Sequence, residues 1–181
     1  MIFEDGTGGG NRVKVDSENR MHTFAVVEPE DKHINKEGKV WSIHLSVTPA
    51  GANDYFFYLK NTGTEQVSIS DVRISSTVAT QVTYEHVSGT PIYVTGTDAS
   101  VTNRNLGSSN APEVTAKYDT DITGLSTSGI LFFEECANAD TRYKLSTSSN
   151  IIIPQGQAIA FKRVAATGQI DCVISLVGLE S

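Results

Sequence analysis

The sequence lacks any long run of apolar residues. Its apolar clusters are only a few residues long, whereas about 20 are needed for a helix to span a bilayer. The first residues, MIFED, also lack the basic start and the following apolar run of a secretory signal peptide. We therefore expect no membrane partner and no export signal.

Cysteine and charge are scarce as well. The two cysteines, Cys136 and Cys172, lie far apart and lack the spacing of metal ligands. This is typical of buried thiols in a reducing cytoplasm, although a disulfide between them stays open. Charged residues make up 19% of the chain, and the net charge is −7. An acidic surface repels phosphate, so we expect no nucleic-acid partner.

What the sequence does have is strand patterning. Ile43, Leu45 and Val47 alternate with polar residues, which is the period of two of a half-buried strand. In residues 54–75, two runs rich in aromatic and β-branched residues flank the break NTGTEQ. That segment predicts a strand, a turn and a second strand, paired as a hairpin.

Further short strands between turn formers are expected along the rest of the chain. They are expected at residues 78–87, 114–118, 129–134, 142–145, 151–153, 158–161 and 170–176, and the strand at 129–134 is expected to be buried. The last two are expected to pair with each other across the turn at 165–169. Without a convincing helix, this spacing predicts an all-β fold, a jelly roll or β-sandwich of about eight antiparallel strands.

The first 38 residues differ from the rest of the chain. A glycine run opens them, and alternating residues at 12–15 and 23–26 predict two short strands joined by a turn, or an extended arm that pairs with a neighbour's edge. We therefore predict an N-terminal arm and linker at 1–38 and a sandwich domain at 39–181.

Two polar segments are expected to have no regular structure. Residues 28–39 are charged and poor in apolar residues, which favours a linker over a helix. Residues 96–112 are almost all turn formers. A loop of that length in a compact domain is usually functional, so we expect it to project outward or to pack on neighbouring subunits.

No combination of residues predicts catalysis. Glu134 and Glu135 are adjacent carboxylates, but neighbours on a strand point to opposite faces and cannot flank one bond. The histidines are scattered singly; His44 and His86 could meet across strands, but no third metal ligand accompanies them. Neither a nucleophile elbow nor a phosphate loop occurs. We therefore expect a protein that is not an enzyme and needs no cofactor or metal.

Two binding sites stay open as alternatives. Asp119, Asp121 and Thr123 could offer oxygen ligands to calcium from an irregular loop. Four aromatic residues could form a platform that stacks on sugars, although aromatic residues on strands are more often core or rim packing. These residues are Trp41, Tyr55, Tyr58 and Tyr93.

The N-terminal segment FEDGTGGGNRVKVDSENRMHTFAV resembles the opening of small structural proteins of tailed bacteriophages. The shared pattern is an Asp-Gly-Thr-Gly start, a glycine, an alternating Lys/Val strand, then Asn-Arg and a short apolar strand. It falls on Asp5–Gly10, Val13–Val15, Asn19–Arg20 and Thr23–Val27. In addition, TSSNIIIPQGQAIAFKR is similar to segments of virion jelly-roll proteins.

The resemblance implies a non-enzymatic virion protein made in the host bacterial cytoplasm. Because packaged DNA fills a capsid, the acidic charge favours the capsid exterior, where a decoration or cement protein binds and stabilises the shell. The implied partners are the major capsid protein and further copies of this chain, as a homotrimer. A head-fibre, neck or tail component and a carbohydrate-binding β-sandwich module are the alternatives.

The glycine run and the first strands are the segments expected to contact the capsid or neighbouring subunits. The residues concerned are Gly6, Gly8, Gly9, Gly10, Arg12, Val13, Lys14, Val15, Arg20 and Phe24.

Overall fold

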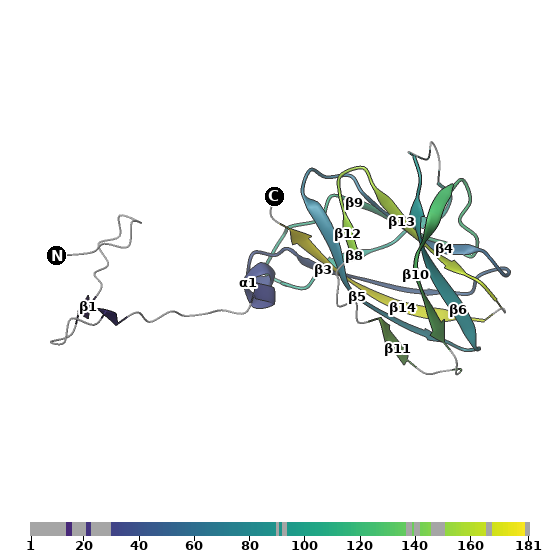
Figure 1. The fold of residues 1–181 in the computed structure, drawn as a ribbon, viewed down its shortest axis with the longest axis horizontal. Coiled ribbons are helices and arrows are strands. Elements are labelled where there is room, and N and C mark those ends of the chain that lie inside the picture. The colour runs from purple at the N-terminus through teal and green to yellow at the C-terminus, as the bar shows by residue number, and fades with distance from the viewer. Residues whose placement is uncertain are drawn as a thin grey trace. The chain divides into compact units, whose positions relative to one another are not determined.

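The structure, a computed structural model, is almost entirely β (Figure 1). Strands make up most of the described residues and helix only a small share, which confirms the predicted all-β class. The structure describes residues 14–15, 21–22, 30–89, 91, 94–136, 139, 142–145, 151–165 and 168–179. By its internal contacts the chain divides into two units, residues 1–32 and 33–181.

The described residues form one helix and fourteen strands. The first are β1 (Lys14–Val15), β2 (Met21–His22) and α1 (Glu30–Lys36). The second unit, called the body below, contains β3 (Val40–Val47), β4 (Tyr55–Asn61), β5 (Gln66–Ser76), β6 (Thr80–Val87), β7 (Thr97–Asp98), β8 (Val101–Asn103), β9 (Val114–Tyr118), β10 (Thr127–Cys136), β11 (Arg142–Leu145), β12 (Ile151–Ile153), β13 (Ala158–Arg163) and β14 (Ile170–Leu179).

Two antiparallel sheets make up the body (Figure 1). Sheet 1 has the order β11-β5-β14-β3-β8, and β12 also pairs with β5; sheet 2 has the order β10-β6-β13-β4-β9-β7. Without the additional β7, β8 and β9, and with β11 and β12 sharing one edge, each sheet has four strand positions. Two facing sheets of four strands are the architecture of a jelly roll. The predicted all-β sandwich of two antiparallel sheets is therefore confirmed, and the body contains more strands than the roughly eight expected.

Strands that follow each other along the body are not paired with each other. β4 and β5, expected to form a hairpin, lie in opposite sheets, and so do β13 and β14, so both expected pairings are wrong. At the first crossing the buried Asn61 supports the change of sheet. Its side-chain NH₂ donates to the carbonyl oxygens of Glu65 and Ile153 at 2.7 and 2.9 Å, and its Oδ1 accepts from the Gly63 N–H at 3.0 Å. One side chain thus supplies hydrogen-bond partners to three backbone groups, at a corner of the chain between two strands that do not pair with each other.

The core lies between the two sheets. The inward positions of β3 that alternation predicted are buried, as are those of the central strands β13 and β14. Phe161 of β13 lies among three aromatic rings, with centroid distances of 6.2 Å to Phe56, 5.0 Å to Phe57 and 4.5 Å to Tyr84. All four rings are among the largest fully buried side chains of the described core.

Both cysteines lie in this core and do not form a disulfide with each other. Cys136 ends β10 and Cys172 lies on β14, and neither is exposed to solvent. Burial raises the pKa of the Cys172 thiol far above its ordinary value, and the nearby Cys136 adds to the rise. The interpretation as buried thiols is therefore confirmed, and the open alternative of a disulfide does not apply.

The segment 28–39 contains a helix, against expectation. α1 starts with two acidic residues and carries His33 and Lys36 in its last turn, charges that suit the helix dipole at each end. Gly38, with φ 73°, takes the left-handed conformation that ends helices, and its N–H donates to the Asn35 carbonyl at 3.0 Å. Among the described residues, no helix is long and apolar enough to cross a membrane.

The polar segment 96–112 also has more structure than expected. It contains β7 and β8, which extend the two sheets at their edges. At the end of β8 and after it, the side-chain amides of Asn103, Asn105 and Asn110 donate to the carbonyl oxygens of residues 35–38 at 2.7–3.2 Å. The segment therefore packs on the end of α1 in its own chain, where sequence reasoning expected it to project outward or to contact neighbours.

Candidate functional site

The ten residues predicted to contact the capsid or neighbouring subunits all lie in the first unit. Of these, the structure describes Lys14 and Val15, which form β1 and pair with His22 and Met21 of β2. The first predicted strand is thus present at its last two residues, and the second, at 23–26, lies outside the described residues. The other eight also lie outside them: Gly6, Gly8, Gly9, Gly10, Arg12, Val13, Arg20 and Phe24.

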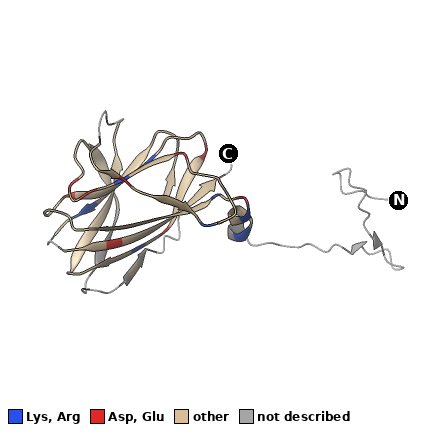
Figure 2. Ribbon diagram, turned by 180° about the vertical axis from the view of Figure 1, so that it is seen from behind, with Lys and Arg blue, Asp and Glu red and all other residues tan. Residues whose placement is uncertain are grey.

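The body has an exposed apolar surface of its own. Ile130 is 60% exposed, and Leu131 and Ile152 are each 50% exposed. Leu131 and Ile152 line a pocket of about 390 Å³, together with residues 86, 151, 153–154 and 157–159. We call this pocket, with Ile130 beside it, the edge groove. Among the described residues that line it there is no Lys, Arg, Asp or Glu, and Figure 2 shows that such residues are sparse along the body's strands in general.

The edge groove lies beside two edge strands, β10 and β12, and the structure describes a pairing neighbour on one side of each. In the described part of the chain, β10 pairs with β6 and β12 pairs with β5. Register shifts in β10 after Thr127 and after Ile130 mark β-bulges, which bend an edge strand and re-aim its side chains. Edge strands that expose apolar residues are templates for another strand, so this groove is the best candidate for a protein contact.

Sequence reasoning missed this surface because it assigned 129–134 to a buried strand. That assignment is wrong for Ile130 and Leu131. The available signal was the absence of alternation: in a run such as Ile151–Ile153, a strand must turn at least one apolar side chain outward. The structure turns Ile152 outward and buries Ile153.

A chain of hydrogen bonds forms the polar wall of the edge groove. His86 Nδ1 lies 2.6 Å from Ser128 Oγ, and His86 Nε2 lies 2.9 Å from Gln157 Oε1. Because a carbonyl oxygen can only accept, Nε2 carries the proton and Nδ1 accepts from the Ser128 hydroxyl. The order serine, histidine, amide occurs in some nucleophilic sites, but the neutral Gln157 adds no charge to stabilise a protonated His86. We interpret this series of hydrogen bonds as a structural link between β6, β10 and the β12–β13 turn.

The outer face of sheet 2 holds a buried carboxylate. Glu85, 4% exposed, accepts from the Tyr55 hydroxyl at 2.7 Å and the Thr83 hydroxyl at 3.0 Å, and Lys162 Nζ lies 3.2 Å away. Burial acts to raise the pKa of Glu85, but hydrogen bonds from Tyr55, Thr127, Lys162 and Thr83 together outweigh it and lower the pKa. The ionised carboxylate is thus fully partnered, which makes this cluster a structural support of the sheet.

The substitution Glu85→Gln is expected to lower the free energy of unfolding at neutral pH by about 1–3 kcal/mol, because a neutral amide accepts weaker hydrogen bonds than a carboxylate. Since the folded-state pKa lies below the ordinary 4.5, the contribution of the carboxylate is complete above that pH. It is lost as the pH falls through the folded pKa. Urea unfolding of the wild type and of the Glu85→Gln variant should show a difference in the free energy of unfolding that narrows as the pH is lowered below 4.5.

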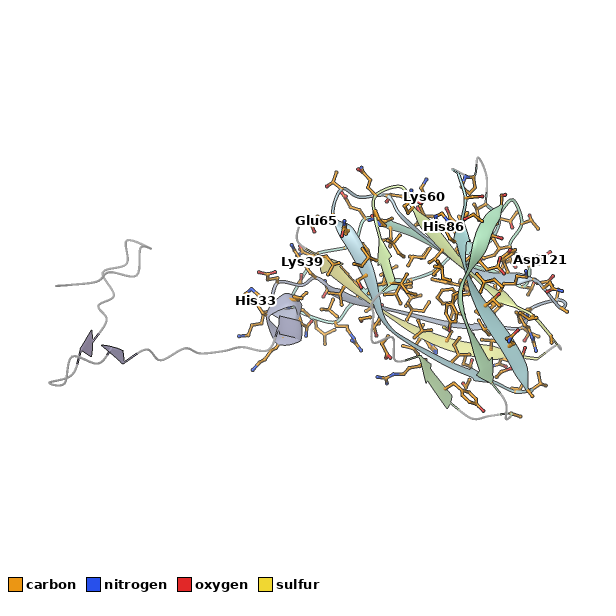
Figure 3. All side chains as sticks on the ribbon, viewed as in Figure 1. His33, Lys39, Lys60, Glu65, His86 and Asp121 are labelled. Atoms are coloured by element: carbon orange, nitrogen blue, oxygen red, sulfur yellow. The ribbon has the colours of Figure 1, made fainter. Side chains whose placement is uncertain are left out.

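The matched control for Glu85 is Glu65→Gln. Glu65 is 56% exposed, and its carboxylate lies 3.6 Å from Lys39 Nζ (Figure 3). Exposed pairs of this kind contribute about 0–1 kcal/mol, so the control should change little at any pH. Equal effects of the two substitutions would contradict the role given to Glu85.

The aromatic residues considered for sugar stacking do not form a platform. Trp41 is 5% and Tyr58 3% exposed, and they belong to β3 and β4, which lie in different sheets. The indole N–H of Trp41 donates to the Asn110 carbonyl at 3.1 Å. Tyr55 is engaged with Glu85, and Tyr93 lies outside the described residues. For the three described rings, the structure agrees with the favoured interpretation as core or rim packing and does not support the alternative of a shared stacking surface.

The loop considered for calcium is acidic. The pKa of Asp121 is raised, first by partial burial and then by the charges of Asp54 and Asp119. Among the described residues, no group of three or more His, Cys, Asp and Glu side chains is arranged to hold a metal ion. His44 and His86 lie in different sheets and do not meet.

Comparisons with models of protein families, with curated protein sequences and with solved structures found no match to this chain. The edge groove and the N-terminal unit are therefore interpreted from their own sequence and geometry.

Proposed function

We propose that this chain is a non-enzymatic structural protein of a tailed-bacteriophage virion, and that it binds the outside of the capsid and stabilises the shell. The division of the chain carries the proposal. An N-terminal unit of residues 1–32, without cysteine, is separate in its contacts from a jelly-roll body. Chains below about 40 residues rarely hold a core without disulfides, metals or a partner. In this proposal a partner surface covers the apolar residues of the N-terminal unit. The sequence pattern of the unit resembles that of bacteriophage structural proteins, so the proposed partner is the capsid.

The charge of the chain supports a position on the exterior. With a net charge of −7, the protein is repelled by packaged DNA and is better placed on the outer surface of the shell. A protein that binds only the assembled shell stabilises it by mass action. Its partners in this proposal are the major capsid protein and further copies of the same chain, arranged as a homotrimer.

A head-fibre, neck or tail component is the closest alternative. It would use the same N-terminal attachment but at a different place on the virion, so the location of binding separates the two. For a carbohydrate-binding module, the buried positions of Trp41 and Tyr58 offer no support.

Deleting residues 1–20 is expected to weaken binding to capsids at least about tenfold, because the deletion removes the glycine run and β1. The measurement is co-sedimentation of full-length and shortened protein with tail-free capsids from which the native copies have been stripped. The body should keep its urea midpoint in the shortened protein, which serves as the folding control.

Two outcomes would contradict the proposal. Unchanged binding of the shortened protein would remove the role of the N-terminal unit. If the full-length protein does not bind capsids but binds purified necks or tails, the exterior position on the capsid is wrong.

A further inference from the structure

The edge groove is a neutral, apolar surface on an acidic chain. Its lining residues are aliphatic, apart from His86, Pro154 and Gln157. Leu131 and Ile152 expose half of their area there. Two copies with a net charge of −7 each repel one another, but the described lining of this groove adds no charge to that repulsion. A second copy can therefore approach here without meeting a like charge in the described lining.

The backbone at the groove also favours a strand as the occupant. β12 pairs with β5 along residues 151–153, and the structure describes no strand on its other side. β10 is the last strand of sheet 2. An extended segment that adds to such an edge gains main-chain hydrogen bonds, and its alternate side chains enter the adjacent pocket.

The chain itself contains a segment of matching chemistry. Thr23–Val27 (TFAVV) has four apolar residues in five, no charge, and two alternate side chains, Phe24 and Val26, that share one side of a strand. It follows β2 in a unit too short to bury these residues in a core of its own. Residues 23–29 can span about 23 Å when extended, which is about twice the length of a three-residue strand such as β12.

The geometry points to strand exchange between copies: Thr23–Val27 of one copy adds to the β12 edge of a neighbouring copy, with Phe24 in the pocket lined by Leu131 and Ile152. Each copy then donates one segment and accepts one, a head-to-tail contact that closes into a ring. This inference specifies how the copies associate in the proposed function. It involves no capsid surface, so it can be tested independently of capsid binding.

Mass measurement of the purified full-length chain by light scattering tests the exchange. The wild-type chain is expected to form a closed oligomer, with a trimer as the predicted ring. Phe24→Ser and the double substitution Leu131→Ser with Ile152→Ser should each weaken association at least about tenfold, since apolar anchors of this kind carry most of an interface's binding energy. Leu106→Ser is the matched control, because Leu106 is 94% exposed but does not line the groove.

Mixing the two variants gives the sharpest readout. The Phe24→Ser protein retains a wild-type groove, and the groove variant retains a wild-type arm, so together they should form a one-to-one complex although each alone is a monomer. Unchanged urea midpoints would show that both proteins are folded.

A monomeric wild-type chain, an oligomer that survives the groove substitutions, or a mixture that stays monomeric would each overturn the inference. Because no capsid is present, none of these results depends on capsid binding. Conversely, loss of capsid binding by an intact oligomer would overturn the proposed function alone.

Discussion

Replacing Phe161 with alanine is expected to lower the free energy of unfolding by about 3–5 kcal/mol. Phe161 is fully buried on β13, and its ring contacts Phe56, Phe57 and Tyr84. The substitution removes the transfer energy of the ring, leaves a cavity between the sheets, and abolishes aromatic pairs that add about 0.5–1.5 kcal/mol each beyond their area. Urea unfolding at constant slope measures the loss as a shift of the midpoint.

Two further substitutions define the scale of this effect. Phe161→Leu retains most of the buried volume and should cost clearly less than the alanine substitution. Leu106→Ala removes a side chain that is 94% exposed and should stay within about 0.5 kcal/mol of the wild type. If Phe161→Ala is as mild as Leu106→Ala, the aromatic cluster does not hold the sheets together.

Replacing Arg163 with alanine is expected to be similarly damaging. Arg163 is fully buried at the end of β13, and hydrogen bonds to backbone carbonyls hold its guanidinium: Nε to Ala165 at 3.0 Å and Nη1 to Gly168 at 2.6 Å. Nε also lies 3.3 Å from Thr80 Oγ1. Burial lowers the pKa of Arg163, but arginine stays protonated at any working pH. Alanine leaves these partly buried carbonyls without their donor, at up to about 1–3 kcal/mol each, and opens a cavity where the fully buried side chain lay.

Arg163→Lys separates charge from geometry. Lysine keeps the positive charge, but its single ammonium cannot reproduce the planar fork that reaches two carbonyls at once, so we expect an intermediate midpoint in urea. A variant Arg163→Ala that is as stable as the wild type would show that the cost of burying the charge equals the gain from its hydrogen bonds.

Alternation was sufficient to predict most strands but not their partners. Residues 43–47 and 114–118 fall in strands as expected, because a period of two is a local property that survives in any sheet. The expected hairpin at 54–75 failed because its two strands belong to opposite sheets. What redirects the chain is the buried side chain of Asn61, whose partners include the distant Ile153 carbonyl. No local pattern reports such a contact.

The lack of alternation indicates that an apolar side chain must turn outward, but the position of the edge groove has a cause that is not local. Exposure of Ile130 and Ile152 depends on which strand ends a sheet, and that follows from the global strand order. The helix at 30–36 was missed because it is short and poor in apolar residues, whereas its stability comes from terminal charges, Gly38 and the asparagine contacts of 96–112. Those contacts join segments that are distant in sequence.

The strand order has a consequence for how the protein is made. β14 lies between β5 and β3 in sheet 1, and β13 lies between β6 and β4 in sheet 2, so the last two strands in chain order each occupy a central position in one sheet. Before they are synthesised, pairs such as β4–β9 and β6–β10 can form, but neither sheet is continuous. The two sheets are therefore completed late, by pairings between distant parts of the chain, which form slowly. A chain that stops before β13 lacks the central strand of each sheet.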